Sequence, residues 1–242
     1  PHLFDEAQFA KKVRRPLEDA GWIEAEGLAT GVHGGRSGRV VGTTKLRSIP
    51  ISQILPDFDQ VIPSDLRSKL NTPLDDVFSD LIGVDKHKAG LALELLALRM
   101  IMDLGLQPRG FRVRSAETAF AEVDLVAEGA HLLFSRWTFQ CKRYAPGSKS
   151  RVGLGDVAKE VGIAKFAKAH VVVMVTTTDF TQQARNYAAE VAKATHLQFV
   201  FVDGTAVEQY LSVGRGFLWE FFLENAEDVM VAKREQALPS SE

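Results

Sequence analysis

The sequence predicts an α/β protein with a central mixed β-sheet flanked by helices and a smaller N-terminal companion segment. Two short runs rich in β-branched residues, 171–176 and 197–202, are typical of strands buried on both faces. A helical pattern follows each run, and strand–helix–strand order implies right-handed crossovers between parallel strands. Three segments that precede them, 111–114, 120–127 and 132–144, are predicted to form a meander of strands.

Residues 1–80 are expected to form the companion segment, and residues 81–242 the main domain with a C-terminal helix. A helix is expected over 4–20, where apolar residues recur at helical spacing and Pro16 kinks or ends the helix. Prolines between 50 and 73 indicate an irregular region, and the companion segment is expected to end near Asp80.

A glycine-rich stretch, 31–39, lies within the companion segment and contains Arg36 and Arg39. It lacks the lysine and the spacing of a phosphate-binding P-loop. A hairpin or loop is the first interpretation. The alternative is that Arg36 and Arg39 contact the phosphates of a nucleic acid.

The strongest helical pattern in the main domain runs from 86 to 104 and stops at Gly105. Its apolar stripe is formed by Leu91, Leu95, Leu98 and Met102. Glu94 lies in the middle of this apolar helix, so it either faces solvent or points into a site. Further helices are expected over 156–169, 182–194 with Thr181 as N-cap, 207–211 and 217–236, the last for packing or for a dimer contact.

Polar residues on two neighbouring predicted strands form the most informative pattern. Gln140 and Lys142 lie two residues apart, so they project from one face while Cys141 projects from the other. Asp124 on the preceding strand adds a carboxylate, and Glu122 is either a second one or a strand-end residue in water. Oxygen ligands beside an ammonium group suit a divalent cation and a phosphodiester.

The charge distribution is informative only locally. The net charge is −2, which does not indicate a nucleic-acid-binding protein. Residues 136–168 are strongly basic, however, which a phosphate backbone would need, although a merely solvated face is the alternative. The candidates for phosphate contact in this strip are Arg143, Lys149, Arg151 and Lys159.

Several other classes of protein are not indicated. No apolar run is long enough to span a bilayer, and the start carries no signal-peptide pattern. A single cysteine excludes an internal disulfide and favours a cytoplasmic location. The six histidines show no metal-ligand spacing with Cys141, and no serine lies in a nucleophile elbow. The chain starts at Pro1, so it is either processed or a fragment.

The order Glu94, Asp124 and Gln140-Cys-Lys-Arg-Tyr144 resembles the PD-(D/E)xK nuclease superfamily, and specifically the Mrr-like restriction endonuclease catalytic domain. That family often has glutamine where the superfamily has an acidic residue. The resemblance continues through Thr-Thr-Thr178 and the segment 179–188, and it covers roughly 80–213. One departure is the stretch before Asp124, which lacks the glycine-rich turn common in relatives.

The resemblance implies a restriction-endonuclease-like fold and Mg²⁺-dependent hydrolysis of DNA, with Mn²⁺ as a possible substitute. Asp124, Gln140 and Lys142 become the catalytic core, Glu94 the helical acid, and Asp124, Gln140 and Glu94 the metal ligands. One site cuts one strand, so duplex cleavage predicts a homodimer or higher oligomer. A restriction or defence role is expected, and a modification-dependent enzyme remains open. The alternatives are a junction-resolvase-like nuclease acting on structured DNA or RNA, and a catalytically weak DNA-binding module.

Overall fold

The computed structural model describes residues 15–21, 23–26, 39–42, 58–118, 121–129 and 133–237. The chain divides into two compact units, Pro1–Pro56 and Asp57–Glu242. This division lies well before Asp80, where the sequence placed the end of the companion segment.

The first unit is described in three short elements. They are helix α2 (Arg15–Asp19) and two antiparallel strands, β1 (Ile23–Glu26) and β2 (Arg39–Gly42). Of the helix predicted over 4–20, only this last part lies within the described residues. Pro16 is in its first turn, where a missing N–H leaves no hydrogen bond unmade.

The two arginines of the glycine-rich stretch cannot be placed as phosphate ligands. Arg36 lies outside the described residues. Arg39 belongs to β2, where it pairs with Glu26 in the strand register, and its side chain is not described. Their contact with a nucleic acid therefore stays a prediction.

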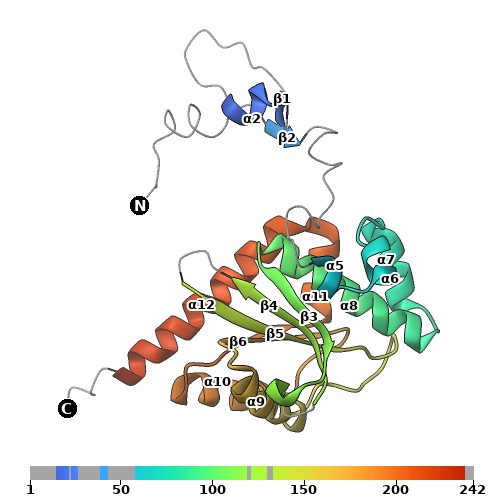
Figure 1. The fold of residues 1–242 in the computed structure, drawn as a ribbon. Helices are drawn as coiled ribbons and strands as arrows, with labels where there is room; N and C mark the ends of the chain where they lie inside the picture. Colours follow the sequence, from blue (N-terminus) through green and yellow to red (C-terminus); the bar gives the residue numbers. More distant parts are fainter. Residues whose placement is uncertain are drawn as a thin grey trace. The chain divides into compact units, whose positions relative to one another are not determined.

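A five-stranded mixed sheet forms the centre of the second unit (Figure 1). Its strands stand in chain order: β3 (Gln107–Val113), β4 (Val123–Gly129), β5 (Ser135–Lys142), β6 (Val171–Thr176) and β7 (Gln198–Val202). The first three strands are antiparallel, and β5, β6 and β7 are parallel. The predicted mixed sheet is confirmed, and so is the meander that leads into its parallel half.

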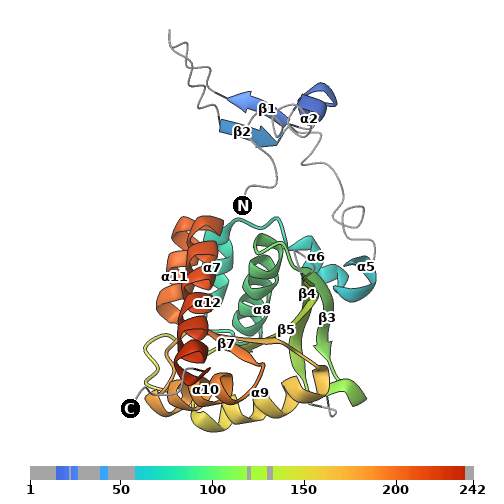
Figure 2. The same ribbon diagram turned by 90° about the vertical axis from the view of Figure 1, so that its left-hand side faces the viewer.

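Helices cover both faces of this sheet (Figure 2). Helix α8 (Lys86–Asp103) packs against one face, mainly on β3, β4 and β5. Helices α9 (Leu154–Ala167) and α10 (Gln182–Ala194) cover the other face, where they enclose an apolar cluster that includes Val172 and Met174. Gln140 is in register with Met174, so Gln140 and Lys142 project toward the α9 face.

Local sequence explains where these helices begin and end. The side chain of Asp85 accepts hydrogen bonds from the amides of His87 and Lys88 and caps α8. Gly105 follows with a φ of +72°, a conformation that glycine adopts without strain. The Thr181 hydroxyl accepts from the Ala184 amide and starts α10, as the sequence predicted.

The described part of the proline-rich stretch, from residue 58 onward, is mostly helical, so the prediction of an irregular region is wrong there. It contains helices α5 (Phe58–Val61), α6 (Ser64–Ser68) and α7 (Leu74–Ile82). Pro63 and Pro73 precede α6 and α7 as their N-cap residues, a position that needs no N–H donor. Arg99 of α8 donates to the carbonyls of Lys69, Leu70 and Thr72. These contacts hold the loop after α6 against α8.

Two helices complete the second unit, α11 (Gly204–Val213) and α12 (Arg215–Ala237). The start of α12 is attached to the end of α8, because Leu218 is buried and the Trp219 indole donates to the Asp103 carbonyl at 3.0 Å. Farther along, Met230 and Val231 are exposed. The first half of α12 is thus a packing helix. Within the described residues, no helix is both long and apolar enough to cross a membrane.

Candidate active site

The candidate site is built on the pairing of β4 with β5. The register places Leu125 opposite Phe139, so the preceding Asp124 comes opposite Gln140. Asp124 Oδ2 accepts hydrogen bonds from Gln140 Nε2 and from the Cys141 amide, both at 2.7 Å. Both side chains are buried. The structure therefore brings Asp124 and Gln140 together as the sequence predicted.

Burial dominates the ionisation of Asp124. It raises the pKa of this carboxyl to about 6, although the hydrogen bond from the Cys141 amide acts in the opposite direction. The nearby carboxylates of Glu94 and Glu122 raise the pKa further, while the Arg112 guanidinium lowers it. A cation bound beside this carboxyl would favour its charged form.

Lys142 lies in the same site, where its ammonium group forms an ion pair with an acidic side chain. Its Nζ lies 3.0 Å from Asp156 Oδ1, at the start of α9. Desolvation lowers the pKa of Lys142, but the Asp156 carboxylate outweighs it and brings the pKa above its ordinary value. The amine therefore stays protonated at neutral pH. Asp156 also accepts from the Gly153 amide and caps α9, which fixes its position.

Glu94 points toward the site, but both of its oxygens are occupied. Arg112 of β3 donates Nε to Oε2 at 3.0 Å and Nη2 to Oε1 at 2.9 Å. Arg112 has a φ of +46°, which is uncommon for a residue with a side chain and marks a locally constrained strand end. The helical acid is thus placed near Asp124 and bound to an arginine. Its role as a metal ligand stays a prediction.

Glu122 directly precedes β4, and its role as a second carboxylate stays a prediction. Its side chain is partly exposed and forms an ion pair with Arg114 at 2.7 Å. Cys141 faces away from Lys142, as expected, with its Sγ 3.9 Å from the Leu93 carbonyl on the α8 side. Burial raises the pKa of this thiol, so it is not a nucleophile for this site.

Sequence reasoning missed two acids on α9, Asp156 and Glu160. They lie four residues apart, so they share one face of the helix. Glu160 is only 2% exposed, and its Oε1 has no hydrogen-bond partner among the described residues. Burial raises the pKa of Glu160 to about 7, while Lys159 and Lys142 oppose the rise. The i, i+4 spacing of two acids facing a strand with Gln140 and Lys142 was the signal available in the sequence.

The four basic residues proposed for phosphate contact have different surroundings. Arg143 donates to the carbonyls of Leu81 and Gly83 and so anchors the end of α7. Lys159 is exposed on α9. Lys149 and Arg151 line a cavity of about 690 Å³ at the carboxyl ends of β5 and β6. Other residues that line this cavity are Phe78, Tyr144, Thr177 and Val207.

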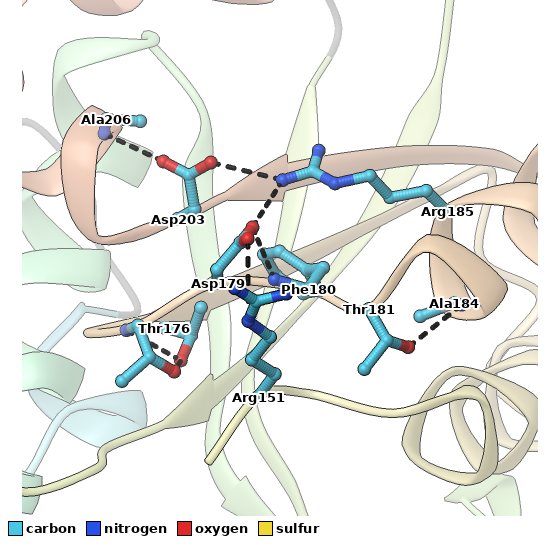
Figure 3. A network of polar contacts seen from close by, with 10 residues as sticks. Arg151, Thr176, Asp179, Phe180, Thr181, Ala184, Arg185, Asp203 and Ala206 are labelled. Carbon is cyan, nitrogen blue, oxygen red and sulfur yellow. Dashed lines mark hydrogen bonds and ion pairs between the residues drawn. The ribbon is translucent and has the colours of Figure 1, made fainter. Parts of the chain in front are cut away.

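Arg151 also belongs to a polar network at the carboxyl ends of β6 and β7 (Figure 3). Asp179 contacts Arg185 at 2.8 Å and Arg151 at 3.9 Å, and Arg185 contacts Asp203 at 3.2 Å. Asp203 caps α11 through the Ala206 amide. The hydrogen bond from Arg185 holds the pKa of Asp179 below its ordinary value. In this network each carboxylate has a cationic partner.

No group of three or more His, Cys, Asp or Glu side chains suited to hold a metal ion occurs within the part of the chain that the structure describes. Asp124 and Gln140 nevertheless fit a hard cation. The Gln140 Oε1 is buried without a hydrogen-bond partner among the described residues. Both hydrogen bonds to Asp124 reach Oδ2, so Oδ1 accepts none from those residues. Two oxygen donors are therefore available side by side.

Comparison with known proteins gives one family. Residues 92–211 match the family Mrr_cat, described as "Restriction endonuclease". The search of the curated proteins finds no match.

Three solved structures are similar at low identity. A protein of unknown function, AF1548, is 15% identical with a TM-score of 0.36, over 58% of this chain and 92% of that one. The DNA modification-dependent restriction endonuclease AspBHI is 13% identical with a TM-score of 0.40, over 70% of this chain and 42% of that one. The MspJI restriction endonuclease, in complex with a 27-mer oligonucleotide, is 20% identical with a TM-score of 0.36, over 82% and 40%. The matched parts span about two fifths of the last two chains.

Proposed function

Because residues 92–211 belong to the Mrr-like restriction endonuclease family of the PD-(D/E)xK superfamily, we propose that this chain is a Mg²⁺-dependent endonuclease that hydrolyses DNA phosphodiester bonds. One observation carries the proposal. A buried carboxylate, Asp124, is held at 2.7 Å by Gln140, and the cation of Lys142 projects from the same strand face two residues away. Oxygen donors for a metal ion beside a fixed cation can stabilise the charge that develops during phosphodiester hydrolysis.

Asp124 Oδ1 and Gln140 Oε1 are the donors that would hold the metal ion. Proteins of this family generally use divalent metal ions. When bound, such an ion supplies Lewis-acid stabilisation of the phosphate and of the attacking oxygen. Gln140 is uncharged, so it contributes an amide oxygen and, through Nε2, keeps Asp124 in place. The Cys141 amide gives Asp124 a second fixed contact.

Lys142 is assigned to the charge that develops on the phosphate. Its pairing with Asp156 keeps it protonated, so it serves as a cation and not as a general base at neutral pH. The phosphate would have to compete with Asp156 for this ammonium group. The expected reaction is an in-line attack of water that leaves a 5′-phosphate, as the family resemblance implies.

The surface next to Lys142 supports a polynucleotide substrate. Lys149 and Arg151 line the cavity beside Tyr144, which follows Lys142 by two residues on the chain, and Lys159 is exposed on α9. These cations lie on segments that lead into and out of the site, where a phosphate backbone would need them. One site cleaves one strand, so we propose that duplex cleavage uses two copies of the chain. A restriction or defence role follows from the family.

The test is cleavage of supercoiled plasmid with Mg²⁺ or Mn²⁺, on methylated and on unmethylated DNA. Lys142→Ala is expected to lower the rate about 10²- to 10³-fold, because it removes a preorganised cation. Lys193→Ala is the matched control, since Lys193 also pairs with an acid, Glu190 at 3.0 Å, but on the outside of α10. EDTA should abolish cleavage by the wild type.

Equal cleavage by wild type and Lys142→Ala would exclude this site as the catalytic one. Metal-dependent binding of structured DNA or RNA, with cleavage of that substrate and not of plasmid, would move the function to a structure-selective nuclease. DNA binding that needs no metal and leads to no cleavage would indicate a binding module.

A further inference from the structure

Two buried oxygen atoms near Lys142 have no hydrogen-bond partner among the described residues: Gln140 Oε1 and Glu160 Oε1. Buried polar atoms are paired in more than about 90% of cases, because an unpaired one loses its hydration without compensation. Gln140 is 8% exposed and Glu160 is 2% exposed. Two such atoms on facing elements call for a common explanation.

The geometry of β5 and α9 places these two residues opposite each other. Helix α9 connects β5 to the parallel strand β6, so it runs back along β5 in the opposite direction. Lys142 on β5 faces Asp156 on α9 at 3.0 Å. Gln140 precedes Lys142 by two residues, which is about 6.6 Å along the strand. Glu160 follows Asp156 by four residues, which is about 6 Å along the helix axis.

The same spacing leads one step deeper to two buried residues. Two residues before Gln140 is Thr138, and four residues after Glu160 is Ala164. Both are buried, Ala164 within the apolar cluster between α9 and the sheet. Glu160 is therefore one helical turn from a residue of this apolar cluster.

Asp124 joins this level through Gln140. Its Oδ2 lies 2.7 Å from Gln140 Nε2, so Asp124 and Gln140 lie together on the sheet face that α9, the helix of Glu160, covers. The cation of this region, Lys142, contacts Asp156. Glu94 on the α8 side has both oxygens bound by Arg112. Of the two buried glutamates, Glu160 is the one whose oxygen is available to a ligand.

We infer that Glu160 is a second carboxylate ligand of the divalent metal site, supplied by helix α9 where Gln140 offers only a neutral amide. The inference rests on the proposed function, since it names a further residue of the same site. Two carboxylates offset both charges of Mg²⁺, and the amide oxygen of Gln140 adds a third donor. Magnesium commonly takes one or two carboxylates from the protein and completes its shell with water and substrate phosphate.

Direct titration of the full chain with Mn²⁺ in the absence of DNA, followed by electron paramagnetic resonance of the free ion, tests this inference. Glu160→Gln keeps the shape and removes the charge, and it is expected to weaken Mn²⁺ binding about 10-fold or more. Asp124→Asn should weaken it comparably. Glu220→Gln, the same change at an exposed position on α12, should bind as the wild type does.

Thermal unfolding gives a second readout that does not depend on cleavage. Without metal, Glu160→Gln should unfold at the same or a higher temperature than the wild type, because it removes a buried unpaired charge. With Mn²⁺, the wild type should gain stability and Glu160→Gln should gain little. Glu160→Asp, which keeps the charge on a shorter side chain, should bind Mn²⁺ with intermediate affinity.

The outcomes separate this inference from the proposed function. Wild type that binds Mn²⁺ and cleaves plasmid, with Glu160→Gln binding equally well, overturns the role of Glu160 and leaves the nuclease intact. Wild type that neither binds Mn²⁺ nor cleaves DNA overturns both. Loss of Mn²⁺ binding in Glu160→Gln, with a normal unfolding temperature in the absence of metal, supports the inference.

Discussion

Two polar clusters lie along the carboxyl ends of the parallel strands, and they differ in how their carboxylates are satisfied. At β6 and β7, Asp179 and Asp203 are bound by Arg185, and Asp203 also caps α11 (Figure 3). Near the carboxyl end of β5, Asp124 of β4 and Glu160 of α9 are more deeply buried, and Glu160 Oε1 has no partner among the described residues.

The ionisation of the two clusters reflects this difference. The hydrogen bond from Arg185 lowers the pKa of Asp179, whereas burial raises the pKa of Asp124 to about 6 and of Glu160 to about 7. A network in which every charge is compensated stabilises the fold. Buried carboxylates whose charge is not compensated lower the stability of the fold and are typical of ligand-binding sites. The comparison therefore distinguishes a structural network from the proposed metal site.

The largest expected effect is on the unfolding free energy of the metal-free protein, which should depend on pH because of Asp124 and Glu160. A carboxyl whose pKa is raised in the folded state keeps its proton when the unfolded chain has lost it. Stability should therefore fall as the pH rises from about 4 through 7. The ordinary pKa values of Asp124 and Glu160 are 3.8 and 4.5. The rise in pKa of each group corresponds to a loss of at most about 3 kcal/mol of unfolding free energy across this pH range.

Urea unfolding in EDTA between pH 5 and 8 measures this dependence. The carboxyls with lowered pKa, such as Asp156 and Asp179, affect stability only at lower pH and do not disturb this window. Asp124→Asn and Glu160→Gln should each flatten the curve, and saturating Mn²⁺ should reverse its slope. A wild-type stability that stays constant or rises across the window would contradict the comparison.

Sequence reasoning was most successful where one local pattern decides the structure. The β-branched run of β6 and the Thr181 cap of α10 were predicted at their observed positions. Period-two alternation also placed Gln140 and Lys142 on one face and Cys141 on the other, since this depends only on strand geometry.

The failures have physical reasons of two kinds. Pro63 and Pro73 were interpreted as ends of regular structure, but a proline at the start of a helix does not prevent the helix that follows it. Hydrogen bonds from Arg99 to the carbonyls of Lys69 and Leu70 then hold the short helices in place. Glu160 was missed because its significance depends on the tertiary alignment of α9 with β5. Likewise, no local pattern indicates that Arg112, eighteen residues from Glu94, binds both of its oxygens.

A smaller effect should come from breaking the structural network. Asp203→Ala removes the cap of α11 and the partner of Arg185, and we expect it to cost about 1–2 kcal/mol of unfolding free energy. Its Mn²⁺ affinity should equal that of the wild type, because Asp203 lies outside the proposed metal site. Chemical denaturation and Mn²⁺ titration of the same sample measure both values. Weakened metal binding would show that the two clusters are coupled and not separate.

The smallest effect on stability is expected for Arg151, which shares features of both clusters. It lies 3.9 Å from Asp179, its side chain is 60% exposed, and it lines the cavity next to Tyr144. An exposed pair at this distance contributes little, so Arg151→Ala should change the unfolding free energy by less than about 0.5 kcal/mol.

DNA affinity should respond differently. If Arg151 contacts a phosphate, its removal should lower the slope of log affinity against log salt by about 1. Fluorescence anisotropy with a labelled duplex at several salt concentrations measures this, in Ca²⁺ or EDTA to prevent cleavage. Lys193→Ala, on the outside of α10, is the control and should leave the slope unchanged. An unchanged slope in Arg151→Ala would assign this arginine to the structural network alone, whereas a lowered slope would place the DNA path along the cavity, beside the end of the strand that carries Lys142.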